Sequence, residues 1–368
     1  MFRLGGYIFA EVFTFPMALT IRDVAREANL STATVSHVLN KTGQVGQETR
    51  SHALAVVRRL GYFPNAHARN LAWRSSRTLG MIVSDIENPF FPEVINSFEG
   101  RARQLGYEII LSDTNYDSSL TQRAAEKMIE HNVRGVAVMT SEANLRLIDE
   151  IARRRIAVTF LDLGPVQKFV SNMRIDYFSA IQQVVEHLFH LGHRRMVFAG
   201  DRAGLKSNNA RREAFAECLK GLGLDPGPSL KGDLRFEGGM AAARAVLKLK
   251  PRPTAVVAVN DLTALGLIKV FTLAGLRVPE DISVTGFDNI HLTEYVTPSI
   301  TTVDIHPDWL GRMAADALHE LATADEPQGK EYLVAADLVV KASTGRAPSR
   351  TVAAEDLSPH SGDLSLTS

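Results

Sequence analysis

Small and polar side chains recur along one side of residues 30–42, whose sequence is LSTATVSHVLNKT. A helix that enters the major groove of DNA needs small or polar side chains near its N-terminus, so that its backbone can approach the base edges, and hydroxyl and amide groups that reach phosphates. The residues that fit base contact are Thr32, Ala33 and His37, and those that fit phosphate contact are Thr34, Ser36 and Asn40. A helix face exposed only to solvent could show the same composition.

Two short amphipathic helices joined by a tight turn are predicted to carry this surface. Apolar residues recur at spacings of three and four in residues 21–28 and again in residues 35–39. Between them, Asn29 can adopt the left-handed conformation that ends a helix, and Ser31 or Thr32 can cap the next one. This arrangement is typical of a helix-turn-helix.

A third helix is predicted over the sequence QETRSHALAVVRRLGY. Its buried face would contain Ala53, Val56, Val57 and Leu60, and Gly61 would end it. Three such helices can close a small core of their own, which directs the apolar side of the second helix inward. The polar side of that helix then remains available to a partner.

The charge distribution favours a phosphate-bearing partner for this part of the chain. Residues 17–77 contain nine basic and three acidic residues, a net charge of +6, whereas the whole chain is neutral. A compact basic segment joined to an acidic body is typical of a protein that binds nucleic acid through one end. A solvated basic surface without a partner is the alternative.

From residue 78 onward the pattern changes to short apolar strands that alternate with amphipathic helices. The predicted strands are residues 78–84, 107–112, 135–139 and 157–162, followed by a second set at 196–200, 254–260 and 282–287. Such alternation predicts parallel sheets with helices on both faces, here in two successive α/β lobes. In parallel sheets a ligand binds at the carboxyl ends of the strands, so a site is expected between the lobes.

Leu71, within PNAHARNLAW, is a lone apolar residue on a short basic segment. It could contact the adjacent domain. Alternatively, it could enter the minor groove of DNA and kink the duplex as a wedge between base pairs.

The sequence resembles the LacI/GalR family of transcriptional repressors from about residue 19 to residue 346. The headpiece resemblance is in TIRDVAREANLSTATVSHVLN and LGYFPNAHARNLA, and the core resemblance is in SDIENPFFPEV, LGHRRMVFAG, RPTAVVAVND and GLRVPEDISVTGFDN. The resemblance implies a helix-turn-helix headpiece on a two-lobed periplasmic-binding-protein-like core, and a homodimer that binds two operator half-sites. It also implies that Leu71 is the leucine inserted at the operator centre, with Asn65, Ala68 and Arg69 at the minor groove. Thr20 completes the set of expected DNA contacts.

The resemblance further assigns side chains to an effector cleft between the lobes. The expected effector-binding residues are Phe90, Phe91, Asp162, Arg211, Asn260 and Asp288. Aromatic faces with converging carboxylates, an amide and a guanidinium suit a polyhydroxylated ligand such as a sugar. Asp162 or Asp288 could instead cap a helix. Leu234 replaces the family's usual aromatic residue, which argues against tight flat stacking there.

Three positions depart from the family pattern. His37 replaces a frequent arginine, so that a bidentate contact to guanine is replaced by at most one good hydrogen bond. Gly46 replaces the usual serine, which weakens the predicted cap of the third helix by a few tenths of a kcal/mol. Tyr177 and Ala180 depart from the family's DNxxG pattern, which leaves the start of that helix undefined.

The expected organisation therefore has five parts. These are a disordered extension at 1–17, a DNA-binding headpiece at 18–63, a hinge helix and linker at 64–77, the two-lobed core at 78–345 and a disordered tail at 346–368. The single cysteine, Cys218, excludes an internal disulfide and is expected to fill the core, and His193 is expected to be structural. No run of residues is apolar enough to span a membrane.

Three classes of function are compatible with a two-lobed α/β core. An enzyme is disfavoured because no glycine-rich phosphate loop, no G-x-S-x-G elbow and no zinc-ligand spacing occurs. A solute-binding protein of a transporter would need an export signal and would lack the headpiece. We therefore expect a cytoplasmic, nucleoid-associated transcriptional regulator that binds double-stranded operator DNA and a small sugar-like effector, without a metal or cofactor.

Overall fold

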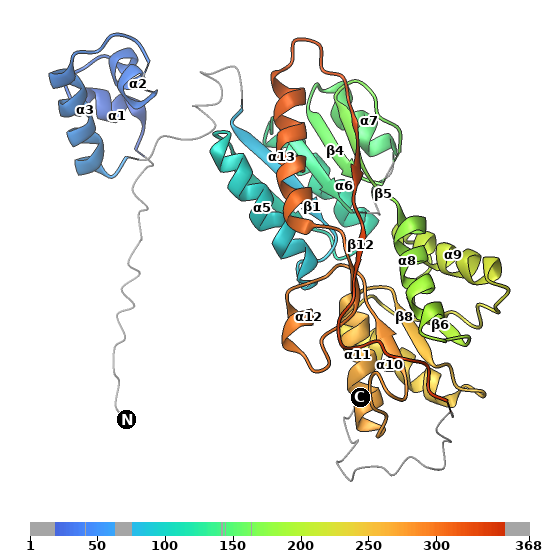
Figure 1. The fold of residues 1–368 in the computed structure, drawn as a ribbon. Coiled ribbons are helices and arrows are strands. Elements are labelled where there is room, and N and C mark those ends of the chain that lie inside the picture. Colours follow the sequence, from blue (N-terminus) through green and yellow to red (C-terminus); the bar gives the residue numbers. More distant parts are fainter. Residues whose placement is uncertain are drawn as a thin grey trace, which may run out of the picture. The chain divides into compact units, whose positions relative to one another are not determined.

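The computed structural model describes residues 19–40, 42–62, 76–140, 143, 145–162 and 164–349. The chain divides into two compact units, with the boundary between Ser76 and Arg77. The first unit is helical and the second is α/β (Figure 1). The expected fold class, a helical headpiece with a two-lobed core of parallel sheets, is confirmed.

The described residues of the first unit form three helices: α1 (Ile21–Glu27), α2 (Thr32–Asn40) and α3 (Gln47–Leu60). Their core consists of buried side chains that include Val24, Val35 and Val56. The apolar residues that recur at spacings of three and four in the sequence are therefore the ones that form this core. Arg59 on α3 also forms a 2.7 Å ion pair with Glu27 on α1.

The turn between α1 and α2 follows the predicted chemistry. Asn29 has a φ of 52°, in the left-handed region that ends a helix. Ser31, and not Thr32, caps α2, because its hydroxyl oxygen accepts the backbone N–H of Thr34 at 3.0 Å. Gly61 ends α3 in the left-handed conformation, and Gly46 occupies the N-cap of α3 without any side-chain hydrogen bond.

A six-stranded, fully parallel sheet forms the first lobe of the second unit, in the order β11-β5-β4-β3-β1-β2. Its strands are β1 (Thr78–Val83), β2 (Glu108–Asp113), β3 (Gly135–Met139), β4 (Ala157–Leu161), β5 (Val170–Ile175) and β11 (Glu331–Val334). Successive residues of β1, β3 and β4 belong to two separate apolar clusters, one on each face. Helices on both faces are the consequence.

The helices of this lobe form two layers (Figure 1). One layer contains α5 (Phe90–Gln104) and α13 (Pro307–Thr323), which pack closely against each other. The other contains α6 (Ser118–Glu130) and α7 (Leu145–Arg153). Because α13 lies near the C-terminus, the first lobe is completed only after the second lobe has been formed along the chain.

The second lobe has a four-stranded parallel sheet in the order β7-β6-β8-β9. Its strands are β6 (Met196–Asp201), β7 (Leu230–Lys231), β8 (Ala255–Ala258) and β9 (Ser283–Thr285). One helical layer contains α8 (Tyr177–His190) and α9 (Lys206–Gly221), and the other contains α10 (Phe236–Lys248) and α11 (Asp261–Leu273). A short helix, α12 (Leu292–Tyr295), follows β9.

The chain passes between the two lobes three times. It leaves the first lobe between β5 and α8, returns between β10 (Thr302–Asp304) and α13, and leaves again between β11 and β12 (Asp337–Val339). β10 and β12 pair with each other as a separate antiparallel ribbon. These three connections are the covalent hinge about which the lobes can move.

Within the described part of the chain, all seven predicted strands are present, together with five that were not predicted. The additional ones are β5, β7, β10, β11 and β12. They are short or contain exposed side chains, such as Leu333 on β11, which is 60 % exposed. β10, β11 and β12 pair with segments far away along the chain, for which the sequence has no local signal, whereas β5 pairs with β11 and with β4, the strand before it.

His193 and Cys218 occupy structural positions. The ring of His193 is buried, with Nδ1 2.9 Å from the Thr254 hydroxyl and Nε2 3.0 Å from the Gly345 carbonyl oxygen. Cys218 on α9 is partly buried against the core, and burial raises the pKa of its thiol. None of the helices in the described ranges is both long and apolar enough to cross a membrane.

Close packing of α13 on α5 makes Gly311 sensitive to substitution. A Cβ atom at Gly311 would lie 2.8 Å from the backbone nitrogen of Phe98 and would also collide with the Val94 carbonyl oxygen. We expect Gly311→Ala to lower the free energy of unfolding by about 1–3 kcal/mol, because backbone atoms cannot move aside cheaply. Gly100→Ala on α5 is the matched control, since its Cβ would meet no atom within 4 Å. Chemical denaturation should show the control to be neutral or stabilising, and equal losses in both variants would contradict the packing argument.

Candidate functional site

The polar face of α2 is exposed as the sequence predicted. Val35 and Val38 are buried, whereas Thr32, Ala33 and His37 are exposed. The Ser31 hydroxyl accepts the hydrogen bond that caps α2, so the Thr32 hydroxyl takes no part in the cap. The three side chains expected to reach base edges are therefore presented together on one accessible surface.

The three side chains expected to reach phosphates are partly buried and already hydrogen-bonded. The Thr34 hydroxyl lies 2.8 Å from the Ser31 hydroxyl, and the Asn40 side-chain amide donates to the Ser36 hydroxyl at 3.1 Å. The Thr20 hydroxyl donates to Asp23 at 2.7 Å, and this hydrogen bond holds the pKa of Asp23 below its usual value. These contacts fix side-chain orientations before any partner is bound.

His37 is tied to the segment that follows α2. Its Nδ1 lies 3.1 Å from the Thr42 hydroxyl, and a Cβ placed at Gly43 would lie 3.0 Å from the same ring nitrogen. Gly43 has a φ of 69°, which glycine adopts without strain. The ring is thereby oriented through one nitrogen, and Nε2 is the atom left for an outside partner. Asn65, Ala68, Arg69 and Leu71, the remaining predicted DNA contacts, lie outside the described residues.

The six predicted effector residues line one cavity between the two lobes of the core. Phe90 and Phe91 begin α5, Asp162 follows β4 and Arg211 lies on α9. Asn260 and Asp288 follow β8 and β9, and both line the cavity too. The cavity volume is about 80 Å³. Strand ends from two different sheets therefore converge where the sequence placed the cleft.

Several cavity residues have strained backbone conformations. Tyr116, Asp162, Leu234 and Asp288 have φ values of 57°, 56°, 70° and 109°, although none is glycine. Each such residue costs on the order of 1–3 kcal/mol, and such residues concentrate at ligand clamps. The surrounding structure therefore holds these residues in costly conformations at the cavity wall.

Neither Asp162 nor Asp288 caps a helix, so that alternative is excluded. Asp176 and His291 are the N-cap residues of α8 and α12. Asp162 instead accepts the backbone N–H of Ile175 at 2.9 Å. Burial raises the pKa of Asp162 and of Asp288 to about 6 each, against the smaller opposing effect of the Arg211 charge.

Arg211 lies against two neighbouring aromatic rings, whose centroids are 6.1 Å apart. Its guanidinium carbon is 4.2 Å from the ring centroid of Phe287 and 5.2 Å from that of Tyr177. One of its terminal nitrogens donates to the Val259 carbonyl oxygen. The rings and this hydrogen bond fix the cation beside Asp162 and Asp288, where it can bind a ligand oxygen.

Three buried polar atoms at the cavity lack a hydrogen-bond partner among the described residues. They are Oδ2 of Asp162, Oδ1 of Asn208 and Nε of Arg211. Leaving such groups unsatisfied costs about 1–3 kcal/mol each. Hydroxyl donors and oxygen acceptors are the groups that match the hydrogen-bonding chemistry of these three atoms. Asn260 is different, because its amide donates to the Leu234 carbonyl at 2.7 Å and accepts the Thr263 N–H at 3.0 Å.

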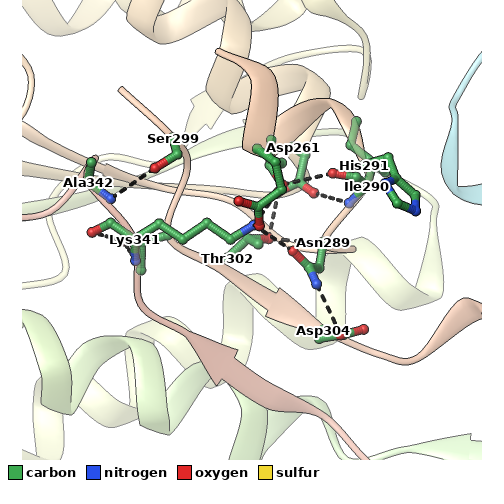
Figure 2. Close-up of polar contacts among 12 residues, drawn as sticks. Asp261, Asn289, Ile290, His291, Ser299, Thr302, Asp304, Lys341 and Ala342 are labelled. Atoms are coloured by element: carbon green, nitrogen blue, oxygen red, sulfur yellow. Dashed lines mark hydrogen bonds and ion pairs between the residues drawn. The ribbon is translucent and has the colours of Figure 1, made fainter. Parts of the chain in front are cut away.

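A buried network holds the loop that carries Asp288 (Figure 2). The Asp261 carboxylate accepts the Ile290 N–H at 2.9 Å and the Thr302 hydroxyl at 2.6 Å. The Lys341 ammonium donates to Asn289 at 2.8 Å, and Asn289 in turn donates to Asp304 at 3.0 Å. Burial and the nearby Asp288 charge raise the pKa of Asp261. The loop is thereby bonded to β10, one of the three hinge connections.

The sequence did not assign several residues that the structure places at the cavity. Asn88, Tyr116, Lys206 and Asn208 line it, and Tyr177, whose position departs from the family pattern, lies beside Asp162 and Arg211. Tyr177 is the first residue of α8, directly after an interlobe connection. The sequence has no signal for this position, because β5, the strand that ends just before Tyr177, was not predicted. Within the described ranges, no cluster of His, Cys, Asp and Glu could hold a metal ion.

Comparison with known proteins bears out both parts of the architecture. Residues 20–65 match the family of bacterial regulatory proteins described as the lacI family, and residues 185–344 match a periplasmic binding protein-like domain. The HTH-type transcriptional repressor PurR of Photobacterium profundum is 33 % identical over 327 residues, which cover 88 % of this chain and 98 % of the relative. The PurR repressor of Pasteurella multocida is 32 % identical with the same coverage.

The chain belongs to the LacI family of bacterial regulatory proteins. Solved structures of the family agree with this. The Lac repressor dimer bound to operator and the anti-inducer ONPF matches with a TM-score of 0.77 at 26 % identity, covering 89 % of this chain and 99 % of the other. A LacI family regulator from Enterococcus faecium with bound ribose matches with a TM-score of 0.65 at 26 % identity, covering 73 % and 99 %. The chain combines a LacI-type headpiece with a periplasmic-binding-protein-like core, and nothing supports the solute-binding alternative.

The raised pKa of Asp288 makes the stability of this LacI family core depend on pH. A carboxyl group whose pKa is higher in the folded than in the unfolded protein favours folding when it is protonated. Protonation of Asp288 should therefore add stability on the order of 1 kcal/mol as the pH falls from 7.5 to 5, and Asp288→Asn should remove this contribution. The opposite contribution of His187 and His193, whose pKa values burial lowers, is the same in both proteins. Denaturation at both pH values measures the difference. An identical pH dependence in the variant would show that Asp288 is already ionised at pH 5.

Proposed function

We propose that this LacI family regulator represses transcription by binding operator DNA as a homodimer, and that a sugar-like effector bound between the lobes changes its operator affinity. The exposed polar face of α2 on a closed three-helix core is the observation that carries the DNA-binding part. The Lac repressor relative is a dimer on its operator. A dimer of this chain would present two such faces to two half-sites.

Individual contacts within the headpiece are part of the proposal. Thr32, Ala33 and His37 would contact base edges, while Thr34, Ser36 and Asn40 would contact phosphates. His37 would use Nε2, because Nδ1 is engaged by Thr42. An imidazole makes one such contact where arginine makes two, so operator preference should differ from that of arginine-bearing relatives.

The polar groups of the cavity support a polyhydroxylated effector. Asp162 and Asp288 would accept hydrogen bonds from ligand hydroxyls, and Arg211 would donate to a ligand oxygen. Phe90 and Phe91 would cover an apolar ring face. The relative with bound ribose shows that a sugar can occupy this fold. Leu234 offers no aromatic ring for flat stacking on the opposite wall.

The link between effector and DNA would be the closure of the lobes. Asp288 is bonded through its loop to β10, which leads into α13 and the first lobe. An effector that binds one degree of closure more tightly shifts the population toward it. The change would reach the two headpieces of a dimer through the segments at residues 64–77, most of which lie outside the described residues. We further propose that the protein acts in the cytoplasm at the nucleoid, without catalysis and without a cofactor or metal.

Leu71→Ala tests the proposed minor-groove wedge. We expect it to weaken binding to an operator selected from a random DNA pool by at least about tenfold, because the bent complex loses its wedge. Binding to nonspecific DNA should change little, since phosphate contacts dominate it and should weaken steeply with salt. Fluorescence anisotropy on both DNAs measures the two affinities. Equal losses on both would contradict the wedge.

Arg211→Ala tests the effector site. A thermal-shift screen of the wild type against sugars, sugar phosphates and nucleobases should first find a ligand, which adds roughly 2.7 kcal/mol of stability at 100 times its dissociation constant. The variant should lose this shift and keep operator affinity, because Arg211 lies in the core cleft. Arg194→Ala is the matched control, since Arg194 also lies over an aromatic ring, that of Phe189, at 3.7 Å. Loss of operator binding in a folded Arg211→Ala protein would contradict the assignment.

A further inference from the structure

Arg235 joins the two lobes of the core across the cleft. It is the N-cap residue of α10 in the second lobe. Its guanidinium forms an ion pair with Asp85 at 3.1 Å, donates to the Asn115 side chain at 3.0 Å and forms a second ion pair with Glu87. All three partners belong to loops after β1 and β2 of the first lobe. One side chain therefore makes three polar contacts from one lobe to the other.

These contacts lie at the edge of the effector cavity. Leu234, which precedes Arg235, lines the cavity, as do Ser84 and Tyr116, the neighbours of Asp85 and Asn115. A second arginine also reaches from the second lobe to the first. The guanidinium carbon of Arg202 lies 4.9 Å from the ring centroid of Tyr116. Arg202 follows β6 of the second lobe. The side of the cleft next to Leu234 and Tyr116 is thus closed by two arginines of one lobe.

With these contacts in place the cavity is small. Its volume of about 80 Å³ is below the roughly 150 Å³ of an engineered cavity that takes up benzene. A ligand of one ring would therefore need the lobes to part slightly. A ligand of two linked rings would need a wider separation of the lobes, which would work against the Arg235 contacts.

Breaking those contacts is costly because of Asp85. Its side chain is only 4 % exposed, whereas that of Glu87 is 70 % exposed. Loss of the arginine would leave a buried carboxylate without its cation, and separation of the lobes would have the same effect. The guanidinium can also serve several acceptors at once, which a lysine ammonium cannot do with the same planar geometry.

We propose that Arg235 is a specificity-determining residue that limits the effector to a compact polyhydroxylated molecule of about one sugar ring. It acts by holding the lobes together at the edge of the cavity, so that larger ligands must work against the interlobe ion pairs. This inference rests on the proposed effector site and adds a size limit to it.

Thermal shift and isothermal titration calorimetry with D-ribose, D-glucose and the disaccharide cellobiose test this limit. The wild type should bind at least one of the two monosaccharides and bind cellobiose at least about tenfold more weakly. Arg235→Ala should reduce this ratio of dissociation constants about tenfold or more. Arg235→Lys should give an intermediate ratio, because one carboxylate can still be paired.

Arg277→Ala is the matched control. Arg277 pairs with Asp281 at 2.9 Å, and the Asp281 side chain is only 9 % exposed, but both residues belong to the second lobe. The control should lose stability without changing the ligand ratio. An unchanged ratio in Arg235→Ala, the same change in the control, wild-type preference for cellobiose, or no binding of any of the three sugars would overturn the size limit. Operator binding by the wild type, measured in parallel on selected DNA, separates these outcomes from a failure of the proposed function.

Discussion

Two carboxylates held in a small cavity between the lobes are the constraint on which the core of this protein depends. Asp288 is buried and Asp162 is partly buried, and burial raises the pKa of each to about 6. Arg211 is the cation beside them, and it is held there by aromatic rings. The strained backbone of the cavity wall and the unsatisfied polar atoms raise the free energy of the protein without a ligand, and binding of a ligand can offset part of this.

The rest of the core holds these groups in place. Parallel sheets bring strand ends to one edge, which is why residues far apart in sequence converge there. The loop carrying Asp288 is fixed by Asp261, Asn289 and Lys341, so a displacement of Asp288 must be shared with β10. Since β10 leads directly into α13, a movement of the ligand site is transmitted through β10 to one of the three connections between the lobes.

The headpiece is held together by interactions within one short stretch of the chain. Its small core is filled by Val24, Val35 and Val56, and its polar face is organised by short-range hydrogen bonds such as that between Asn40 and Ser36. No ligand is needed to form that surface. The domain proposed to contact DNA therefore has a surface organised by its own local hydrogen bonds, whereas the domain proposed to sense the effector has two lobes joined by three connections.

The sequence by itself determined the helix-turn-helix and the seven principal strands, because each depends on local periodicity or turn chemistry, and its resemblance to the LacI/GalR family supplied the six side chains that line the cleft. It did not determine β10, β11 and β12, whose conformation depends on pairing with distant segments. Nor did it indicate that Tyr177 would lie beside Asp162, or that Arg235 would reach Asp85 across the cleft. Those contacts join residues of different lobes, and only the three hinge connections and the closure of the lobes decide which side chains meet.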